Sequence, residues 1–402
     1  MSIFEGFLST SEAVAAFSGH SLVAAMLRFE AALAQAQAEE GVIPAAAAHS
    51  IVRTCQVELF DVAKIVRESS FAGSVAIPLV KALREAVGLF NPEAVAWTHF
   101  GTTSQDVIDT ALALVTRDAL ALVDTDLARV VQALLALAER HAGTPMLART
   151  LMQPASVTSL GFKCVDWAAP LVRGQARLQQ AAASALQLQL GGGVGTLAQM
   201  QGAAPAAAVR ARMAAALDLR DAGSAWHTQR DEWVALGCAL GLLTGSLGKL
   251  AADLALLGQH EVGEVMEPSE PGRGSSTVMP HKHNPVASMV ALAAAQRAPQ
   301  RVAGLLGAMV QQHERALGAW QAELAEWPSL WMAAHGSLRA LATALPGLRV
   351  DAARMQANID RVCAELPAQT VREWFAPALA EAAGAQARQR IALLRGGPVA
   401  PA

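Results

Sequence analysis

Residues 106–141 read DVIDTALALVTRDALALVDTDLARVVQALLALAERH, and this stretch decides the fold of the chain. It contains neither glycine nor proline, and it is rich in alanine and leucine, the strongest helix formers. At about 1.5 Å per residue, a helix of this length would extend about 50 Å. The stretch therefore predicts one long helix, and a helix this long implies an elongated bundle.

Four further segments share this apolar, helix-periodic character: 153–190, 232–261, 285–315 and 319–345. Alternating strand patterns are not evident in the sequence. The predicted fold class is therefore all-α, with three helical regions built around a central long-helix bundle. We expect an N-terminal helical domain, the central bundle and a short C-terminal helical domain, with the boundaries 1–106, 107–345 and 346–402.

The composition predicts a large buried surface. Hydrophobic residues make up 53% of the 402 residues and charged residues 16%. Few helix faces look polar, so we expect bundles from several chains to pack together. The longest strongly apolar run, 233–248, is shorter than the roughly 20 residues of a spanning helix. The first residues lack the basic and apolar regions of a signal peptide, so no membrane or export role is expected.

Charge and cysteine usage point to a cytoplasmic protein that does not bind nucleic acid. The formal net charge is -3, whereas nucleic-acid-binding domains carry a basic surface. The four cysteines lack metal-ligand spacing and are expected to be free thiols in a reducing compartment. They are Cys55, Cys164, Cys238 and Cys363.

Residues 271–285, PGRGSSTVMPHKHNP, combine glycines, hydroxyls and basic side chains between apolar segments. Asn284 and Pro285 are typical of a helix start, as N-cap and first-turn residues. His281 and Lys282 precede that start, where backbone N–H groups favour an anion. The pattern predicts a lid that closes over a carboxylate-bearing substrate, and the alternative is a solvated loop between two helices.

A second group of hydroxyls lies just before the long helix. Thr103 and Ser104 offer two hydroxyls and backbone donors at a helix start, which suits an anion. Simple helix capping is the alternative for both. Asp106 is interpreted as a cap or helix-dipole partner rather than a base. The glycine-rich run 191–195 follows a helical pattern rather than a strand, so it predicts a chain reversal and not a phosphate loop.

The loop at 271–285 resembles the signature loop of the fumarase/aspartase superfamily, Gly-Ser-Ser-x-Met-Pro-x-Lys-x-Asn. The match is strong over 279–285, but one extra residue separates the serines from Met279. The family's catalytic base lies six positions before the lysine. Counting back from Lys282 gives Ser276, with Ser275 as the alternative.

Two more stretches resemble the same superfamily. Residues 99–106, HFGTTSQD, are similar to its first region, where a Thr-Ser pair binds a substrate carboxylate. Residues 149–155, RTLMQPA, are similar to its second region. Several branches have an acid–base histidine where this chain has Leu151. The cycloisomerase branch that acts on 3-carboxy-cis,cis-muconate also lacks that histidine, and it is similar at 193–198, 226–231 and 313–323.

The resemblance implies an intramolecular addition in which a substrate carboxylate attacks a double bond and forms a lactone, without metal or cofactor. Ser276 or Ser275 would carry the proton, Lys282 and Asn284 would stabilise developing charge, and His281 is a candidate proton donor. The residues expected at the substrate are His99, Thr103, Ser104, Thr150, Gln153, His227, Arg230 and Arg315. For the two arginines the alternative is a structural salt bridge, and for the histidines an ordinary buried hydrogen bond.

The resemblance also implies a homotetramer with shared active sites and a small polycarboxylate as the substrate. Three other functions stay open at the level of sequence. One is a cycloisomerase for a substituted muconate, such as one carrying a sulfonate. Another is a lyase of the adenylosuccinate-lyase type, against which Leu151 argues. The third is a catalytically silent scaffold that binds ligands without turnover.

Overall fold

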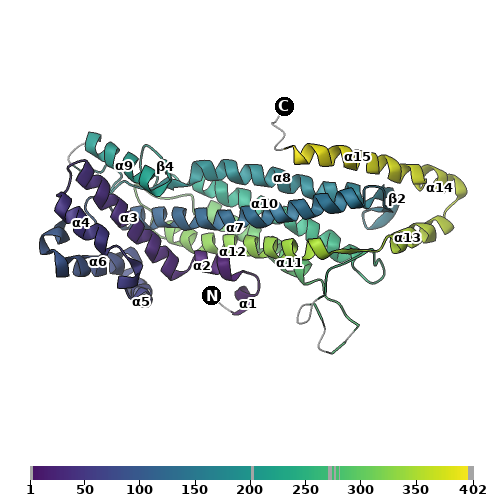
Figure 1. Cartoon of the computed structure of the whole chain (residues 1–402), viewed down its shortest axis with the longest axis horizontal. Coiled ribbons are helices and arrows are strands. Elements are labelled where there is room, and N and C mark those ends of the chain that lie inside the picture. The colour runs from purple at the N-terminus through teal and green to yellow at the C-terminus, as the bar shows by residue number, and fades with distance from the viewer. Residues whose placement is uncertain (1–2, 201–202, 270–273, 276–277, 280, 397–402) are drawn as a thin grey trace.

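The computed structural model describes residues 3–200, 203–269, 274–275, 278–279 and 281–396 of an elongated helical protein (Figure 1). Five long helices run along its axis: α7 (Ser104–Arg140), α8 (Leu160–Ala185), α10 (Asp231–Leu257), α11 (Val286–Gly307) and α12 (Ala319–Ala344). The predicted all-α fold with a central long-helix bundle is confirmed. The 37 residues of α7 make it about 55 Å long, so the two ends of the bundle are far apart.

One group of helices precedes the five long helices in the chain, and a second group follows them. The first group is α1 (Ile3–Gly6), α2 (Ser11–Ala16), α3 (Gly19–Glu39), α4 (Ala45–Thr54), η1 (Val57–Leu59), α5 (Val62–Ala72), α6 (Ala76–Phe90) and η2 (Pro92–Trp97). The second group is η3 (Leu345–Gly347), α13 (Ala352–Ala364), α14 (Ala368–Trp374) and α15 (Pro377–Arg395). We propose the division at residues 106 and 345 as the domain organisation.

The described chain contains a β-hairpin that the sequence interpretation missed. Strands β1 (Pro145–Thr150) and β2 (Gln153–Ser159) pair antiparallel, with Thr150 opposite Gln153. The two turn residues, Leu151 and Met152, both have positive φ angles, 50° and 67°. This is the geometry of a tight hairpin turn, which usually carries asparagine or glycine. An apolar turn removes that signal, so 153–159 looked like the start of α8.

Two further boundaries differ from the prediction. The segment 153–190 is helical only from Leu160 to Ala185, and the helix predicted over 285–315 ends at Gly307. The remaining described elements are α9 (Ala203–Leu217) and the short strand pairs β3 (Gln187–Leu188) with β4 (Arg220–Asp221) and β5 (Val265–Met266) with β6 (Arg349–Val350).

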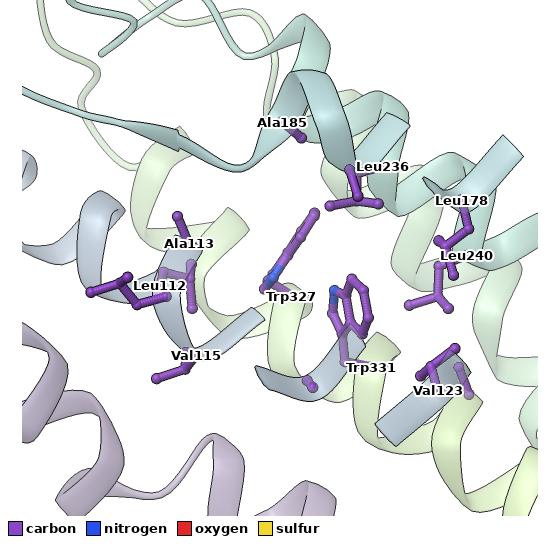
Figure 2. Packing of buried hydrophobic residues seen from close by; sticks show 14 of the residues in the cluster. Leu112, Ala113, Val115, Val123, Leu178, Ala185, Leu236, Leu240, Trp327 and Trp331 are labelled. Atoms are coloured by element: carbon purple, nitrogen blue, oxygen red, sulfur yellow. The ribbon is translucent and has the colours of Figure 1, made fainter. Parts of the chain in front are cut away.

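The core lies between the long helices. Figure 2 shows Trp327 and Trp331 of α12 among apolar side chains of α7, α8 and α10. Trp327 also stacks on Trp233, with ring centroids 4.0 Å apart, and its indole N–H donates to Thr116 at 2.8 Å. Burial of large aromatic rings dominates such interfaces, so these contacts hold α10 and α12 against α7.

Helix α10 is long and apolar enough by composition to cross a membrane. In the molecule, 61% of the most apolar stretch of α10 is buried, and the helix packs against α8, α11 and α12. Core helices of water-soluble bundles have the same character, and the packing of α10 fits that role.

Candidate active site

The start of α7 brings together four of the residues predicted at the substrate. Thr103 is the N-cap residue, and Ser104 is the first residue of the helix. Arg315, from the segment between α11 and α12, donates to the Thr103 hydroxyl. His99 and Ser104 line one cavity of about 420 Å³. A fixed positive charge, two hydroxyls and a helix start therefore meet at one point, which suits a carboxylate.

Asp106 fixes the backbone of this region through hydrogen bonds. The carboxylate is fully buried and accepts from the Thr103 backbone N–H at 3.2 Å and the Thr102 hydroxyl at 3.0 Å. It also accepts from the backbone N–H groups of Gly191 and Gly192, at 2.9 and 2.8 Å. The structure thus agrees with the interpretation of Asp106 as a cap and of the glycine run as a chain reversal.

The glycines at this reversal are required by close packing. A Cβ added to Gly191 would lie 2.5 Å from the Cβ of Ala225, and one on Gly192 would lie 2.8 Å from the Gly101 carbonyl oxygen. Gly192 also has a positive φ of 66°. The backbone N–H groups of this reversal can therefore reach the Asp106 carboxylate only because both positions are glycine.

The structure places His227, which was predicted at the substrate, in the buried interior of the chain. Its Nε2 lies 2.7 Å from Asp106 Oδ1, and 4% of its side chain is exposed. The backbone carbonyl of His227 accepts from Gln105. The alternative, a buried histidine with its hydrogen bonds satisfied, is the one that the structure supports.

Arg230 is also placed differently from the prediction. Its guanidinium is fully buried, donates to Asp109 at 2.8 and 3.2 Å, and donates to Glu323. Burial alone would lower the pKa of Arg230, but the two carboxylates outweigh burial and raise it. Burial raises the pKa of Glu323. The Trp226 indole covers the guanidinium, with its ring centre 4.4 Å from Arg230 Cζ. Arg230 therefore joins α7, α10 and α12 and is not available to a ligand.

Thr150 and Gln153 lie at the other end of the bundle. Both are exposed at the tip of the hairpin, beside Leu151, which is 97% exposed. Helix α7 separates this tip from Thr103 by roughly its own length of about 55 Å (Figure 1). Within one chain, the hairpin group and the Thr103 group cannot contact the same small molecule.

The described part of the signature loop lies nearer to the hairpin end. Arg149 of β1 donates to buried Glu264, next to β5, at 2.6 and 3.1 Å. His281 and Lys282 line a cavity of about 570 Å³ together with Arg349 and Asp351. The fixed positive charges of Lys282 and Arg349 in this cavity suit an anionic ligand.

Two other predicted loop residues line a neighbouring cavity. Ser275 and Asn284 border a space of about 680 Å³. The backbone of Ser275 pairs with that of His283, and the Asn284 N–H donates to the Gly274 carbonyl at 2.8 Å. Ser276 lies outside the described residues. Of the two serines, the structure therefore describes only Ser275, whose side chain is exposed.

The start of α11 is not free for a substrate anion, contrary to the prediction. Glu267 accepts from the backbone N–H groups of Ala287 and Ser288 at 2.9 Å and from the Ser288 hydroxyl at 2.6 Å. The helix begins at Val286, with Pro285 at the N-cap position, one residue later than predicted. The sequence interpretation missed Glu267, because a cap twenty residues upstream carries no local signal.

The arrangement of the motifs leads to the comparison with known proteins. A family model described as "Lyase" matches residues 8–299. The chain belongs to this lyase family, the fumarase/aspartase superfamily. The resemblance inferred from the motifs is confirmed.

Two curated relatives in this superfamily carry the same name, 3-carboxy-cis,cis-muconate cycloisomerase. The one from Bradyrhizobium diazoefficiens is 43% identical, over 90% of this chain and 80% of the relative. The one from Pseudomonas aeruginosa is 44% identical, over 89% of this chain and 77% of the relative. The crystal structure of the 3-carboxy-cis,cis-muconate lactonizing enzyme from Pseudomonas putida superposes with a TM-score of 0.84 at 40% identity, covering 90% of this chain and 80% of that one.

Proposed function

We propose that this protein is a cycloisomerase that converts 3-carboxy-cis,cis-muconate into a carboxymuconolactone, as a step in the breakdown of aromatic compounds. The identity of 43–44% to two curated cycloisomerases, over about nine tenths of the chain, carries this proposal. Leu151 supports the same branch, because the side chain at this position cannot move a proton.

The reaction needs one new C–O bond and one proton. A substrate carboxylate oxygen attacks the double bond, and the electron pair moves onto the carboxylate conjugated with it. An acid then delivers one proton to the other carbon of that double bond, the one attached to the conjugated carboxylate. This step completes the lactone. The transient dianionic carboxylate needs fixed positive charge and N–H donors, and the proton needs one positioned carrier.

Residues of the described site, together with Ser276, would fill these roles. Thr103, Ser104 and Arg315 would hold one carboxylate, and Thr150 and Gln153 another. Lys282 and Asn284 would stabilise the developing charge, and His281 lies in the same cavity as Lys282. Ser276 would carry the proton, with Ser275 as the alternative. A serine hydroxyl needs a lowered pKa for this role, and a neighbouring Lys282 would favour its ionised form.

These groups lie toward opposite ends of one bundle, so the proposal includes a homotetramer whose active sites are shared between subunits. Copies packed side by side and antiparallel would bring the Thr103 group of one chain to the loop of another. Exposed apolar side chains on two long helices support such packing. They are Leu242 and Leu256 of α10 and Met289 and Leu306 of α11. We place the protein in the cytoplasm.

The test is a direct assay of the purified protein with 3-carboxy-cis,cis-muconate in the presence of a chelator. Loss of diene absorbance with one lactone as the product, identified by NMR, is the expected result. Turnover of the 4-sulfo analogue at a higher kcat/KM would assign the substituted muconate instead. Absence of turnover with both muconates, fumarate, adenylosuccinate and argininosuccinate would leave a silent scaffold and refute the proposal.

A further inference from the structure

The cavity of about 420 Å³ between α6 and the start of α7 contains charged residues that the reaction steps above do not use. Lys81, Arg84 and Glu85 of α6 line one side of it, and His99 and Ser104 line the other. Ser104 follows Thr103, so the cavity opens beside the predicted carboxylate site. It therefore extends that site toward the N-terminal helices.

His99 is held by a buried carboxylate. Its Nδ1 lies 2.6 Å from Oε1 of Glu30, which is 1% exposed. A carboxylate only accepts hydrogen bonds, so Nδ1 carries the proton of this bond. The ring then has Nε2 left for a ligand. The second oxygen of Glu30 has no hydrogen-bond partner among the described residues. The bond to Glu30 fixes the orientation of the ring, and Nε2 donates to an anion where it too carries a proton.

The backbone of His99 is fixed as tightly as its ring. The residue has a φ of 62°, a left-handed conformation that a non-glycine residue adopts only where its surroundings impose it. The carbonyl before it, on Thr98, accepts from Arg84 at 3.1 Å. The carbonyl after it, on Phe100, accepts from Gln37 at 2.8 Å. Conformations of this kind concentrate at functional sites, where they position a side chain in advance.

The charge balance of the cavity favours an anion. Lys81 is exposed and forms no ion pair within 4.0 Å among the described residues, and Arg84 adds a second fixed positive charge. Glu85 is the single carboxylate among the described residues that line the cavity. An oriented imidazole, two cations and a serine at a helix start are groups that recognise carboxylates and sulfonates.

We propose that this cavity is the subsite for an anionic substituent of the substrate. His99 is the hydrogen-bond donor, Lys81 supplies unpaired positive charge, and Glu30 is a positioning residue that acts through His99. The proposal rests on the proposed function and names the part of the site that distinguishes a tricarboxylate from a dicarboxylate.

The test measures the binding of propane-1,2,3-tricarboxylate to the full-length protein by calorimetry, which does not depend on turnover. Lys81→Met removes the unpaired charge and is expected to raise Kd about tenfold. Glu85→Gln removes the opposing charge and is expected to lower Kd about threefold. Glu30→Gln replaces the charged acceptor of Nδ1 with a neutral one and weakens the bond that orients the ring, so Kd is expected to rise about tenfold. Both α6 positions are exposed, so these variants should fold even where Glu30→Gln does not.

Lys64→Met and Glu68→Gln are the matched controls, because this exposed pair lies on α5, outside the cavity. Both are expected to leave Kd unchanged. Equal effects of Lys81→Met and Lys64→Met, or shifts of the same sign for Lys81→Met and Glu85→Gln, would overturn the proposal. Absence of tricarboxylate binding by the unaltered protein would overturn it as well.

Turnover of 3-carboxy-cis,cis-muconate is measured in parallel to separate the two proposals. If tricarboxylate binding changes as expected in Lys81→Met and Glu85→Gln but the protein shows no turnover, the cycloisomerase is refuted and the anion subsite is kept. Turnover whose KM is the same in the unaltered protein and in Lys81→Met would keep the cycloisomerase and refute the subsite.

Discussion

At the residue scale, Ser275 and Ser276 are the two candidates for the proton carrier. Ser276 has the family spacing to Lys282, whereas the backbone of Ser275 pairs with His283 and its side chain is exposed. We predict that Ser276→Ala lowers kcat at least about 100-fold, the lower end of the contribution of a general acid–base group. Steady-state kinetics with 3-carboxy-cis,cis-muconate measures this. A Ser275→Ala variant that loses activity while Ser276→Ala keeps it would reverse the assignment.

Arg230 is the cation of a buried cluster with two carboxylates. Removing its charge leaves Asp109 and Glu323 buried without their cation. We predict that Arg230→Met lowers the free energy of unfolding by about 3–5 kcal/mol, as for other broken buried ion pairs. Denaturant unfolding followed by circular dichroism measures this change. Arg395→Met, which breaks an exposed pair with Glu139, is the control and should unfold like the unaltered protein. Equal stability of the two variants would contradict the prediction.

Leu151 replaces the histidine found in other branches of the superfamily. We predict that Leu151→His does not create fumarate hydration or cleavage of adenylosuccinate, because the rest of the pocket is built for a different substrate. Both reactions are assayed by their absorbance changes, with Met152→His as the neighbouring control on the same turn. New activity in Leu151→His alone would show that one side chain separates the branches.

At the scale of elements, the signature loop is anchored at both ends. One end follows β5, and the other is tied by Glu267 to the first amides of α11. A carboxylate at a helix start stabilises the helix by about 1 kcal/mol and fixes where the chain enters it. The loop that carries Lys282 therefore depends on Glu267 for its position.

We predict that Glu267→Ala lowers stability by about 1–2 kcal/mol and also lowers kcat about tenfold or more, because the anchored end of the loop is released. Thermal unfolding and steady-state kinetics are measured on the same preparation. Asp61→Ala is the matched control, since Asp61 caps α5 by accepting from the Lys64 N–H. It should lose comparable stability and keep its kcat. A parallel loss of activity in both variants would assign the effect to stability alone.

At the scale of the whole molecule, the Thr103 group and the loop lie far apart in one chain, so the proposed shared site predicts that activity depends on assembly. We predict that Leu242→Glu, at a side chain 59% exposed in one chain, dissociates the oligomer and abolishes turnover. Light scattering gives the mass, and circular dichroism checks that the helices persist. Leu89→Glu, on α6, is the control and should leave both mass and turnover unchanged. A fully active monomer would refute the shared site.

The sequence by itself determined the long helices and the motifs. Helical periodicity and the absence of glycine and proline over 106–141 are local properties, so they predicted α7 to within a few residues. The hydroxyls at 103 and 104 and the loop lysine were visible for the same reason. The hairpin was not, because Leu151 and Met152 adopt positive φ angles without the usual turn residues.

Only the tertiary structure decided which polar residues are paired in the core and which line a cavity. Arg230 and His227 looked like substrate contacts, but their partners Asp109 and Asp106 each lie 121 positions away. Glu30 and Glu267 carried no signal, because their partners are brought near by packing rather than by spacing. Helical periodicity reports which face is apolar, whereas burial and ion pairing depend on contacts between distant segments, and these exist only once the helices have packed.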